Sequence, residues 1–338
     1  MKYVTLILTL CCLISCKQKT GNDGGKKLYL TTGFVQRLSP ELDKIVDSSA
    51  KGEIIATGFD WAEGPLWLEG KQMLLFSDVP KNIVYQWTEA DSIQDFLLVS
   101  GYTDSAKRGG EMGSNGLLLN DEGKLVLCQC GNRQVVYMKG SIDRPKPEYV
   151  SLAYSYEGKR FNSPNDATLA PNGDIYFTDP PYGLEHGEND PLRQISFNGV
   201  YKIRKDGKIF LLVDSLARPN GIAYLKSTNQ LLISNSDPAK PNWYIYDVMG
   251  DSVKNGRIFA SANGYDRSFA GLPDGMKLDS AENIFATGPG GVHIMNKKGE
   301  TLGILRYDDP VSNCSLSADG KTIFLTNDHR IIRMKLRK

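Results

Sequence analysis

Histidine is scarce in this sequence. Only three histidines occur among the 338 residues, and His186, His293 and His329 are far apart in the chain. A Ser-His-Asp triad needs a histidine beside its nucleophile, and imidazole is a preferred ligand of zinc, copper, iron and nickel. The shortage argues against a triad hydrolase and against a histidine-rich metal site.

The chain also lacks an excess of charge of either sign. Its 40 Lys and Arg residues against 39 Asp and Glu residues leave a formal net charge of +1. Proteins that bind nucleic acid usually concentrate basic residues, so we expect no nucleic-acid partner. With 41% hydrophobic residues, the chain can build the core of one large domain.

No apolar run that we find is long enough to cross a bilayer. The run 4–14 falls well short of the roughly 20 residues that a spanning helix needs. It follows Lys2 at the N-terminus and therefore resembles a secretory signal. It leads into Leu13-Ile14-Ser15-Cys16, which resembles a bacterial lipobox, a motif whose cysteine is lipidated. An ordinary signal peptide with a chance cysteine is the alternative.

We accordingly expect residues 1–16 to be a lipoprotein signal peptide and 17–51 to be a polar tether followed by an irregular segment. The protein would be an exported bacterial lipoprotein, secreted across a membrane and anchored on its periplasmic or cell-surface face. Cys16 would carry the lipid, and this anchor would be the sole contact with the membrane.

The other three cysteines are predicted to be small core residues. Cys128 and Cys130 are two positions apart on one expected strand, so both side chains should face the same side. Such neighbours rarely form a disulfide. Cys314 is isolated, and the spacing does not match a zinc site.

A short signature recurs six times in the rest of the chain. In each copy a polar residue, often followed by glycine, precedes a few apolar residues, a polar turn and a second apolar strand. The copies begin at Glu63, Asn115, Asn165, Asn220, Asp274 and Asn313, and subtraction gives separations of 52, 50, 55, 54 and 39 residues. Units of roughly 40 to 50 residues with several short strands are typical of β-propellers. We therefore predict an all-β, six-bladed β-propeller over residues 52–338.

The six signature residues are predicted to form a ring. Each precedes the first strand of a blade, and first strands line the central channel of a propeller. A lone Asn-Gly pair is most simply a turn, but six matched copies favour a site. Two acids and four amides offer only oxygen ligands, which suit Ca²⁺ or Mg²⁺ better than zinc or copper. From this pattern the predicted ligands are Glu63, Asn165, Asn220 and Asp274.

One strand before the repeats and two long loops within them have predicted roles. The last repeat is short by about one strand, so the apolar run 53–58 is expected to complete the sixth blade and remove its open edge. The loops 101–113 and 180–195 are long. The first is expected to fold over the channel mouth. The second offers candidate ligand contacts, with a plain solvent loop as the alternative: Tyr182, Glu185, His186 and Arg193.

Five motifs together resemble the gluconolactonase / senescence marker protein (regucalcin) family. They are 63–67 (EGPLW), 161–166 (FNSPND), 176–183 (YFTDPPYG), 218–221 (RPNG) and 272–276 (LPDGM). The resemblance covers residues 52–338. It implies a six-bladed propeller with one divalent cation on its axis that hydrolyses sugar lactones. The family also includes relatives that cleave aryl esters and organophosphates.

The resemblance also implies roles for single residues. Glu63, Asn220 and Asp274 match the metal ligands of the family. Asn165 matches an asparagine that contacts substrate and, in bacterial members, lies beside the metal. Together with Asn115 and Tyr182 it forms the predicted substrate-binding set. Asp274 also matches the residue proposed to activate water. We expect Ca²⁺, with Mg²⁺, Zn²⁺ or Mn²⁺ as alternatives.

Two positions depart from the family pattern. Regucalcin-type members carry an arginine where this chain has Ser163, two residues before Asn165. Bacterial members often carry a histidine where this chain has Cys130. The first departure removes a residue that grips a sugar acid.

The predicted function is that of a metal-dependent lactonase or carboxylic-ester hydrolase, acting as a monomer on a small lactone or ester. The cation would polarise the carbonyl, and either Asp274 or a hydroxide formed on the cation would handle the proton of the attacking water. One alternative is an arylesterase or phosphotriesterase that uses the same site. Another is a non-catalytic propeller that binds a protein or glycan and holds a structural Ca²⁺. The acid pair Glu63 and Asp274 favours the enzyme.

Overall fold

The computed structural model describes residues 27–106, 108–266 and 268–337. The predicted signal peptide, its candidate lipidation residue Cys16 and the tether residues 17–26 lie outside the described residues. Within the described ranges, no helix is long and apolar enough to cross a membrane.

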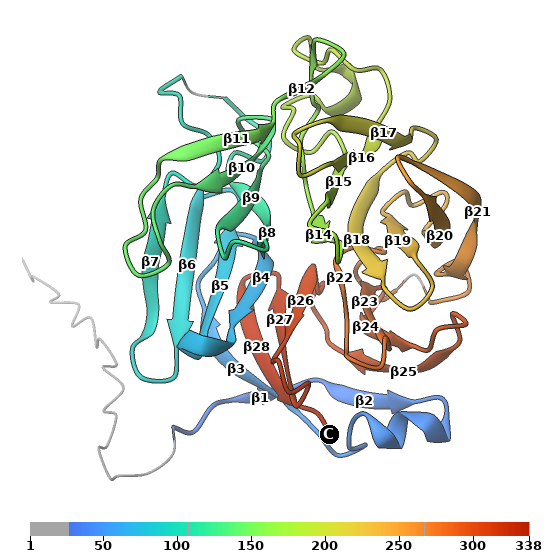
Figure 1. The fold of residues 1–338 in the computed structure, drawn as a ribbon. Helices are drawn as coiled ribbons and strands as arrows, with labels where there is room; N and C mark the ends of the chain where they lie inside the picture. Colours follow the sequence, from blue (N-terminus) through green and yellow to red (C-terminus); the bar gives the residue numbers. More distant parts are fainter. Residues whose placement is uncertain (1–26, 107, 267, 338) are drawn as a thin grey trace, which may run out of the picture.

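The fold is an all-β, six-bladed β-propeller, as the repeats predict (Figure 1). Each blade is an antiparallel sheet whose strands follow one another in sequence. The first blade contains β4 (Ala62–Leu68), β5 (Met73–Asp78), β6 (Ile83–Thr88) and β7 (Ser92–Leu98). The second contains β8 (Ser114–Leu119), β9 (Leu125–Gln129), β10 (Gln134–Met138) and β11 (Tyr149–Ala153). The third contains β14 (Ala167–Leu169), β15 (Ile175–Asp179), β16 (Gly199–Ile203) and β17 (Ile209–Val213).

The remaining blades follow the same plan. The fourth contains β18 (Pro219–Leu225), β19 (Gln230–Asn235), β20 (Asn242–Met249) and β21 (Ser252–Ser261). The fifth contains β22 (Met276–Leu278), β23 (Ile284–Gly288), β24 (Gly291–Met295) and β25 (Thr301–Arg306). The sixth contains β26 (Asn313–Leu316), β27 (Thr322–Asn327) and β28 (Arg330–Lys335). A short hairpin of β12 (Ser155–Tyr156) and β13 (Lys159–Arg160) lies between the second and third blades in sequence.

A strand from the N-terminal part of the chain closes the ring. Strand β3 (Gly52–Thr57) pairs with β28 and gives the sixth blade its fourth strand, as predicted. Figure 1 shows this blue strand beside the red strands of the C-terminus. The edge of β28 is therefore paired, which prevents it from recruiting another chain.

Residues 28–51, which the sequence left irregular, contribute two further strands. Strand β1 (Thr31–Thr32) extends the sixth blade beyond β3, and β2 (Phe34–Arg37) pairs with β25 of the fifth blade. A short 3₁₀ helix, η1 (Pro40–Lys44), follows and buries Leu42. Helical structure in the described residues is otherwise limited to η2 (Glu69–Lys71) and η3 (Gly187–Asn189).

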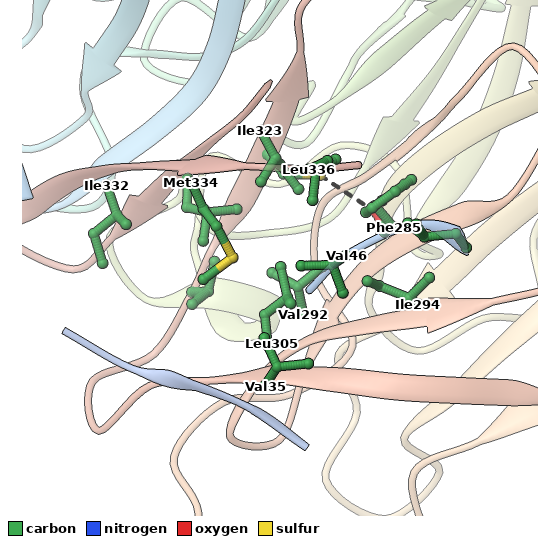
Figure 2. Close-up of a cluster of buried hydrophobic side chains, with 14 of the residues drawn as sticks. Val35, Val46, Phe285, Val292, Ile294, Leu305, Ile323, Ile332, Met334 and Leu336 are labelled. Atoms are coloured by element: carbon green, nitrogen blue, oxygen red, sulfur yellow. Dashed lines mark hydrogen bonds between the residues drawn. The ribbon is translucent and has the colours of Figure 1, made fainter. Parts of the chain in front are cut away.

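Hydrophobic clusters fill the space between adjacent blades. One cluster joins the fifth and sixth blades through Phe285, Leu305 and Ile332, and the N-terminal residues Val35 and Val46 pack against it (Figure 2). The second strands β5 and β9 are buried along their whole length. The outer strands β7 and β21 are largely exposed. The inner half of each blade is therefore fixed by burial.

The three cysteines in the described residues are free and buried, as predicted. Cys128 belongs to the cluster between the second and third blades, and Cys314 belongs to the cluster in Figure 2. The Cys314 thiol lies 3.3 Å from the carbonyl oxygen of Phe285. Cys130 has a different environment, because its thiol lies 3.7 Å from a carboxylate oxygen of Glu111.

Candidate active site

Glycines after the signature residues let the first strands converge on the channel. A Cβ on Gly221 would lie 2.2 Å from the carbonyl oxygen of Asp274 in the next blade. A Cβ on Gly64 would lie 2.0 Å from the carbonyl oxygen of Asn115. Both distances are too short for any side chain, so glycine is needed for close approach of neighbouring backbones. Both glycines lie within strands, so they are packing features of the channel and are not turn residues.

Buried hydroxyls from the second strands hold the signature residues in place. Ser77 Oγ donates to the carbonyl oxygen of Asn115 at 3.0 Å. Ser234 Oγ donates to the carbonyl oxygen of Asp274 at 2.7 Å. Thr178 Oγ1 makes the same bond to Asn220, also at 2.7 Å. The first, third and fourth blades therefore position the signature residue of the next blade through its main chain.

Five of the six signature residues meet in one cavity of about 370 Å³ at one end of the channel. Every predicted metal ligand and every predicted substrate residue lines it: Glu63, Asn115, Asn165, Asn220, Asp274 and Tyr182. These side chains come from different blades, so only closure of the ring brings them together.

The sixth signature residue was predicted one position too late. The main-chain nitrogen of Asn165 donates to Thr178 O, and that of Asp274 donates to Thr287 O. In the last blade the matching donor is the main-chain nitrogen of Ser312, which reaches Thr326 O at 2.9 Å. The ring position therefore belongs to Ser312. Asn313 occupies the following position, where the third blade has Asp166 and the first, second, fourth and fifth blades have glycine. The sequence misled because Asn313 resembles the other signature residues and Ser312 does not.

Two carboxylates dominate the electrostatics of the cavity. Glu63 is 2% exposed, and burial raises its pKa to about 8, with the nearby charges of Asp166 and Glu111 adding to the shift. Burial, followed by the charge of Glu63, also holds the pKa of Asp274 well above its ordinary value. The negative charges are thus poorly compensated by the protein, and a bound cation would favour their ionised forms.

Several amide and carboxylate oxygens in the cavity lack a protein partner. Buried oxygens of Asn115, Asn165 and Asp274 have no hydrogen-bond partner among the described residues. Asn220 donates its amide nitrogen to Ser236 Oγ at 3.0 Å, which leaves its oxygen free to serve as a ligand. Buried polar atoms are normally satisfied, so such a group of orphaned oxygens points to a missing partner.

This donor set fits a hard divalent cation. No three His, Cys, Asp or Glu side chains in the described part of the chain lie close enough to hold a metal by themselves. Glu63 and Asp274 supply two carboxylates, and Asn165 and Asn220 supply amide oxygens. Mixed carboxylate and amide coordination completed by water is common for Ca²⁺.

The loop 101–113 reaches the cavity, as expected, and adds a residue that the sequence reading did not select. Glu111 lines the cavity, and its main-chain nitrogen donates to Tyr182 O at 3.1 Å. Burial raises the pKa of Glu111 to about 7. Its carboxylate lies 3.7 Å from the thiol of Cys130, so Cys130 borders the site. Glu111 lies outside the repeat signature, and only its position four residues before Asn115 hints at a role.

Of the four candidate contacts in the loop 180–195, only Tyr182 lines the cavity. Burial raises the pKa of the Tyr182 hydroxyl. Glu185, His186 and Arg193 do not line the cavity. Arg193 instead contacts Asn198 and the carbonyl oxygen of Glu188. The loop is thus neither a plain solvent loop nor a broad contact surface.

Further lining residues escaped the sequence reading because no repeat marks them. They include Trp61, Arg218, Ser236, Leu272 and Val311. Ser163, which stands at a position of departure from the family, accepts a hydrogen bond from Gly183 N at 2.7 Å. Its hydroxyl therefore supports the second loop.

Known proteins resemble this chain in sequence. Residues 61–329 match the family described as the SMP-30/Gluconolactonase/LRE-like region. A gluconolactonase from Zymomonas mobilis is 36% identical over 312 residues, which cover 90% of this chain and 86% of that protein.

Solved structures share the fold. A gluconolactonase from Xanthomonas campestris has a TM-score of 0.77 at 24% identity, covering 92% of this chain and 99% of its own. A calcium-binding regucalcin from Agrobacterium tumefaciens has a TM-score of 0.62 at 12% identity, covering 85% and 94%. At these identities the two structures support the architecture alone.

Proposed function

Because the chain belongs to the SMP-30/gluconolactonase/LRE-like family, we propose that it is a metal-dependent lactonase that opens the ring of a sugar lactone or similar cyclic ester. The observation that carries the proposal is the ring of orphaned oxygens and buried carboxylates around one cavity. A scaffold that only bound a partner at its rim would gain nothing from this arrangement, because unsatisfied buried oxygens are destabilising.

The side chains that would hold the cation are Glu63, Asn165, Asn220 and Asp274. When bound there, a divalent cation would supply Lewis-acid polarisation of the lactone carbonyl. We propose Ca²⁺ as the native ion because the donor set contains only oxygen.

The residues of this chain divide the remaining work. Asp274 has a buried oxygen without a protein partner, and we assign to it the proton of the attacking water. Asn115 and Asn165 have free amide oxygens that can accept hydrogen bonds from sugar hydroxyls. Tyr182 lines the cavity, and we assign it a contact with the substrate.

Ring opening also requires a proton for the departing oxygen. Water adds to the carbonyl carbon, the ring C–O bond breaks, and the alkoxide that leaves must be protonated. Glu111 has a raised pKa of about 7, so its protonated form is available near neutral pH to supply that proton. Asp274 then releases the water proton to solvent and Glu111 takes up a proton from solvent, which restores both carboxyl groups.

Location and assembly complete the proposal. We propose that the protein is exported, anchored through a lipid on Cys16, and active as a monomer on a small molecule in the periplasm or at the cell surface. The lipobox-like motif before Cys16 supports the anchor.

One panel tests the activity. The purified protein should be assayed with several sugar lactones, with p-nitrophenyl acetate and with paraoxon, each with and without a chelator. We expect lactone hydrolysis that the chelator abolishes and that added Ca²⁺ restores. Faster cleavage of either of the other substrates would instead favour an arylesterase or phosphotriesterase. No cleavage of any substrate would favour a binding propeller.

A further inference from the structure

The wall of the proposed active site carries a single positive charge. Among the described residues that line the cavity, Glu63, Glu111 and Asp274 are acidic and Arg218 alone is basic. A divalent cation would offset part of the acidic charge but would not explain an arginine on the wall.

The backbone of Arg218 is firmly placed. Its main-chain nitrogen donates to Asn235 Oδ1 at 2.8 Å, and its carbonyl oxygen accepts from Ser236 N at 2.9 Å. It lies immediately before β18 and two residues before Asn220. Both side chains line the same cavity.

The guanidinium group of Arg218 has unused hydrogen-bonding capacity. Its one charged neighbour is Glu188, with 3.7 Å between Arg218 Nε and Glu188 Oε1, and the guanidinium makes no hydrogen bond to any described residue. The two side chains are 42% and 43% exposed. An exposed ion pair contributes little stability, so an incoming anion can replace Glu188 at small cost.

We propose that Arg218 binds an anionic group on the substrate, so that this protein prefers acidic lactones, which carry a carboxylate or phosphate, over neutral ones. The planar guanidinium presents paired donors that match both groups. The acidic walls would otherwise repel a negatively charged substrate. The cavity volume of about 370 Å³ lies in the range of small-molecule sites. This inference rests on the proposed lactonase function.

The test compares three lactones that differ in charge. Glucono-1,5-lactone is neutral, glucaro-1,4-lactone carries a carboxylate, and 6-phosphoglucono-1,5-lactone carries a phosphate. For Arg218→Gln we expect the ratio of kcat/KM for an anionic lactone to that for the neutral lactone to fall roughly ten-fold or more, through KM. Compared with Arg218→Gln, the variant Arg218→Lys should keep part of the preference for the anionic lactones, because lysine supplies the charge without the paired donors. Thermal melting verifies folding of each variant.

Comparison of the two anionic substrates identifies the group that Arg218 recognises. A larger loss with the carboxylate lactone would assign the site to sugar acids, and a larger loss with the phosphate lactone would assign it to sugar phosphates.

A variant of Glu188 should act in the opposite direction. Glu188→Gln removes the competing carboxylate, so the KM for the anionic lactones should fall while Arg218→Gln raises it. A simple loss of loop structure would not produce opposite effects from the two partners.

Failures of the two proposals can be distinguished. Calorimetric binding of glucarate, the open dicarboxylate, is measured beside turnover. If lactones are hydrolysed but Arg218→Gln does not change the ratio of kcat/KM between anionic and neutral lactones, the proposed anion site is wrong and the proposed lactonase activity stands. If no lactone is hydrolysed but glucarate binding still depends on Arg218, the anion site stands and the lactonase is wrong.

Discussion

Asn313 and Glu63 lie 250 positions apart in sequence, and Asn313 Nδ2 donates to Glu63 Oε2 at 3.4 Å. The same amide nitrogen lies 3.4 Å from Asp166 Oδ2. Lys277 Nζ is 3.4 Å from Asn313 Oδ1 and 3.7 Å from Asp166 Oδ2. These three residues do not line the candidate active site, so they form a polar layer behind it. The layer orients Glu63 from within the channel.

The charge of the axial acids should determine cation affinity. Glu63→Gln and Asp274→Asn keep an oxygen but remove the charge, so each should weaken Ca²⁺ binding by about ten-fold or more. Both should lose hydrolysis of any lactone that the wild type cleaves. The Asp274 variant should stay inactive when excess Ca²⁺ refills the site, because it also lacks the group that takes the water proton. Isothermal titration calorimetry measures the affinities.

Glu282→Gln is the matched control for these variants. Glu282 pairs with Lys297 at 3.0 Å and lines a second cavity, so its loss should leave Ca²⁺ affinity unchanged. Unchanged affinity in both axial variants would show that the cation binds elsewhere.

Stability of the chelated protein should fall as pH rises. Burial raises the pKa of Glu63 from an ordinary value of 4.5 to about 8. Between these values the folded protein holds a proton that the unfolded chain has released, so rising pH favours unfolding. Saturating Ca²⁺ stabilises the charged carboxylate and should remove this decline. Melting curves from about pH 5 to about pH 9, with EDTA and with Ca²⁺, measure the effect. Parallel curves in the two conditions would contradict it.

Acid should destabilise the fifth blade through His293. This side chain is buried against Trp243 and Tyr265, and burial lowers its pKa from 6.5 to about 4. Its stabilising contribution is complete above pH 6.5 and is lost as pH falls toward 4, because the unfolded chain binds the proton more readily. The loss should reach on the order of 3 kcal/mol.

Denaturant unfolding between these pH values measures how steeply the free energy of unfolding falls with pH. The variant His293→Gln should make this pH dependence flatter, whereas His329→Gln, which changes an exposed histidine, should not. An unchanged slope in His293→Gln would assign the acid sensitivity to other groups.

Removal of the closing strand should abolish cooperative unfolding. A chain that begins after residue 60 lacks β3 and loses the pairing of Ile54 with Ile332 and the ion pair of Glu53 with Arg333. The freed edge of β28 should also promote association. A chain that begins at residue 27 keeps every strand of the described residues and is the control. Equal melting of the two truncated chains would show that β3 is dispensable.

Membrane attachment should depend on Cys16. Substitution Cys16→Ser should release the protein from the membrane fraction while the propeller stays folded, because no lipid can then be attached. The variant Cys12→Ser changes a cysteine inside the apolar run and should remain attached. Cell fractionation followed by immunoblotting measures both. Wild-type protein found in the soluble periplasm would remove the lipoprotein proposal.

The inner part of the fold was predictable because burial leaves a pattern in the sequence. The second strands, such as Ile175–Asp179 and Gln230–Asn235, are the strands that the repeat predicts after each polar turn. They are apolar and bounded by turn residues, and they recur with the repeat. The outer strands were missed because their exposed side chains follow no such pattern, as in the ten residues of β21.

The sequence by itself determined the repeat, the number of blades and the five signature residues that line the cavity. Only the tertiary structure decided that Ser312 takes the sixth position and that Glu111 and Arg218 join the site. The ring residues could be found because each is tied to a strand that every blade repeats. Glu111 lies on a loop whose place depends on long-range contacts, and the main-chain register of Ser312 is set by its partner strand. Arg218 lies beside a ring position, but the acidic surroundings that make it distinctive come from other blades.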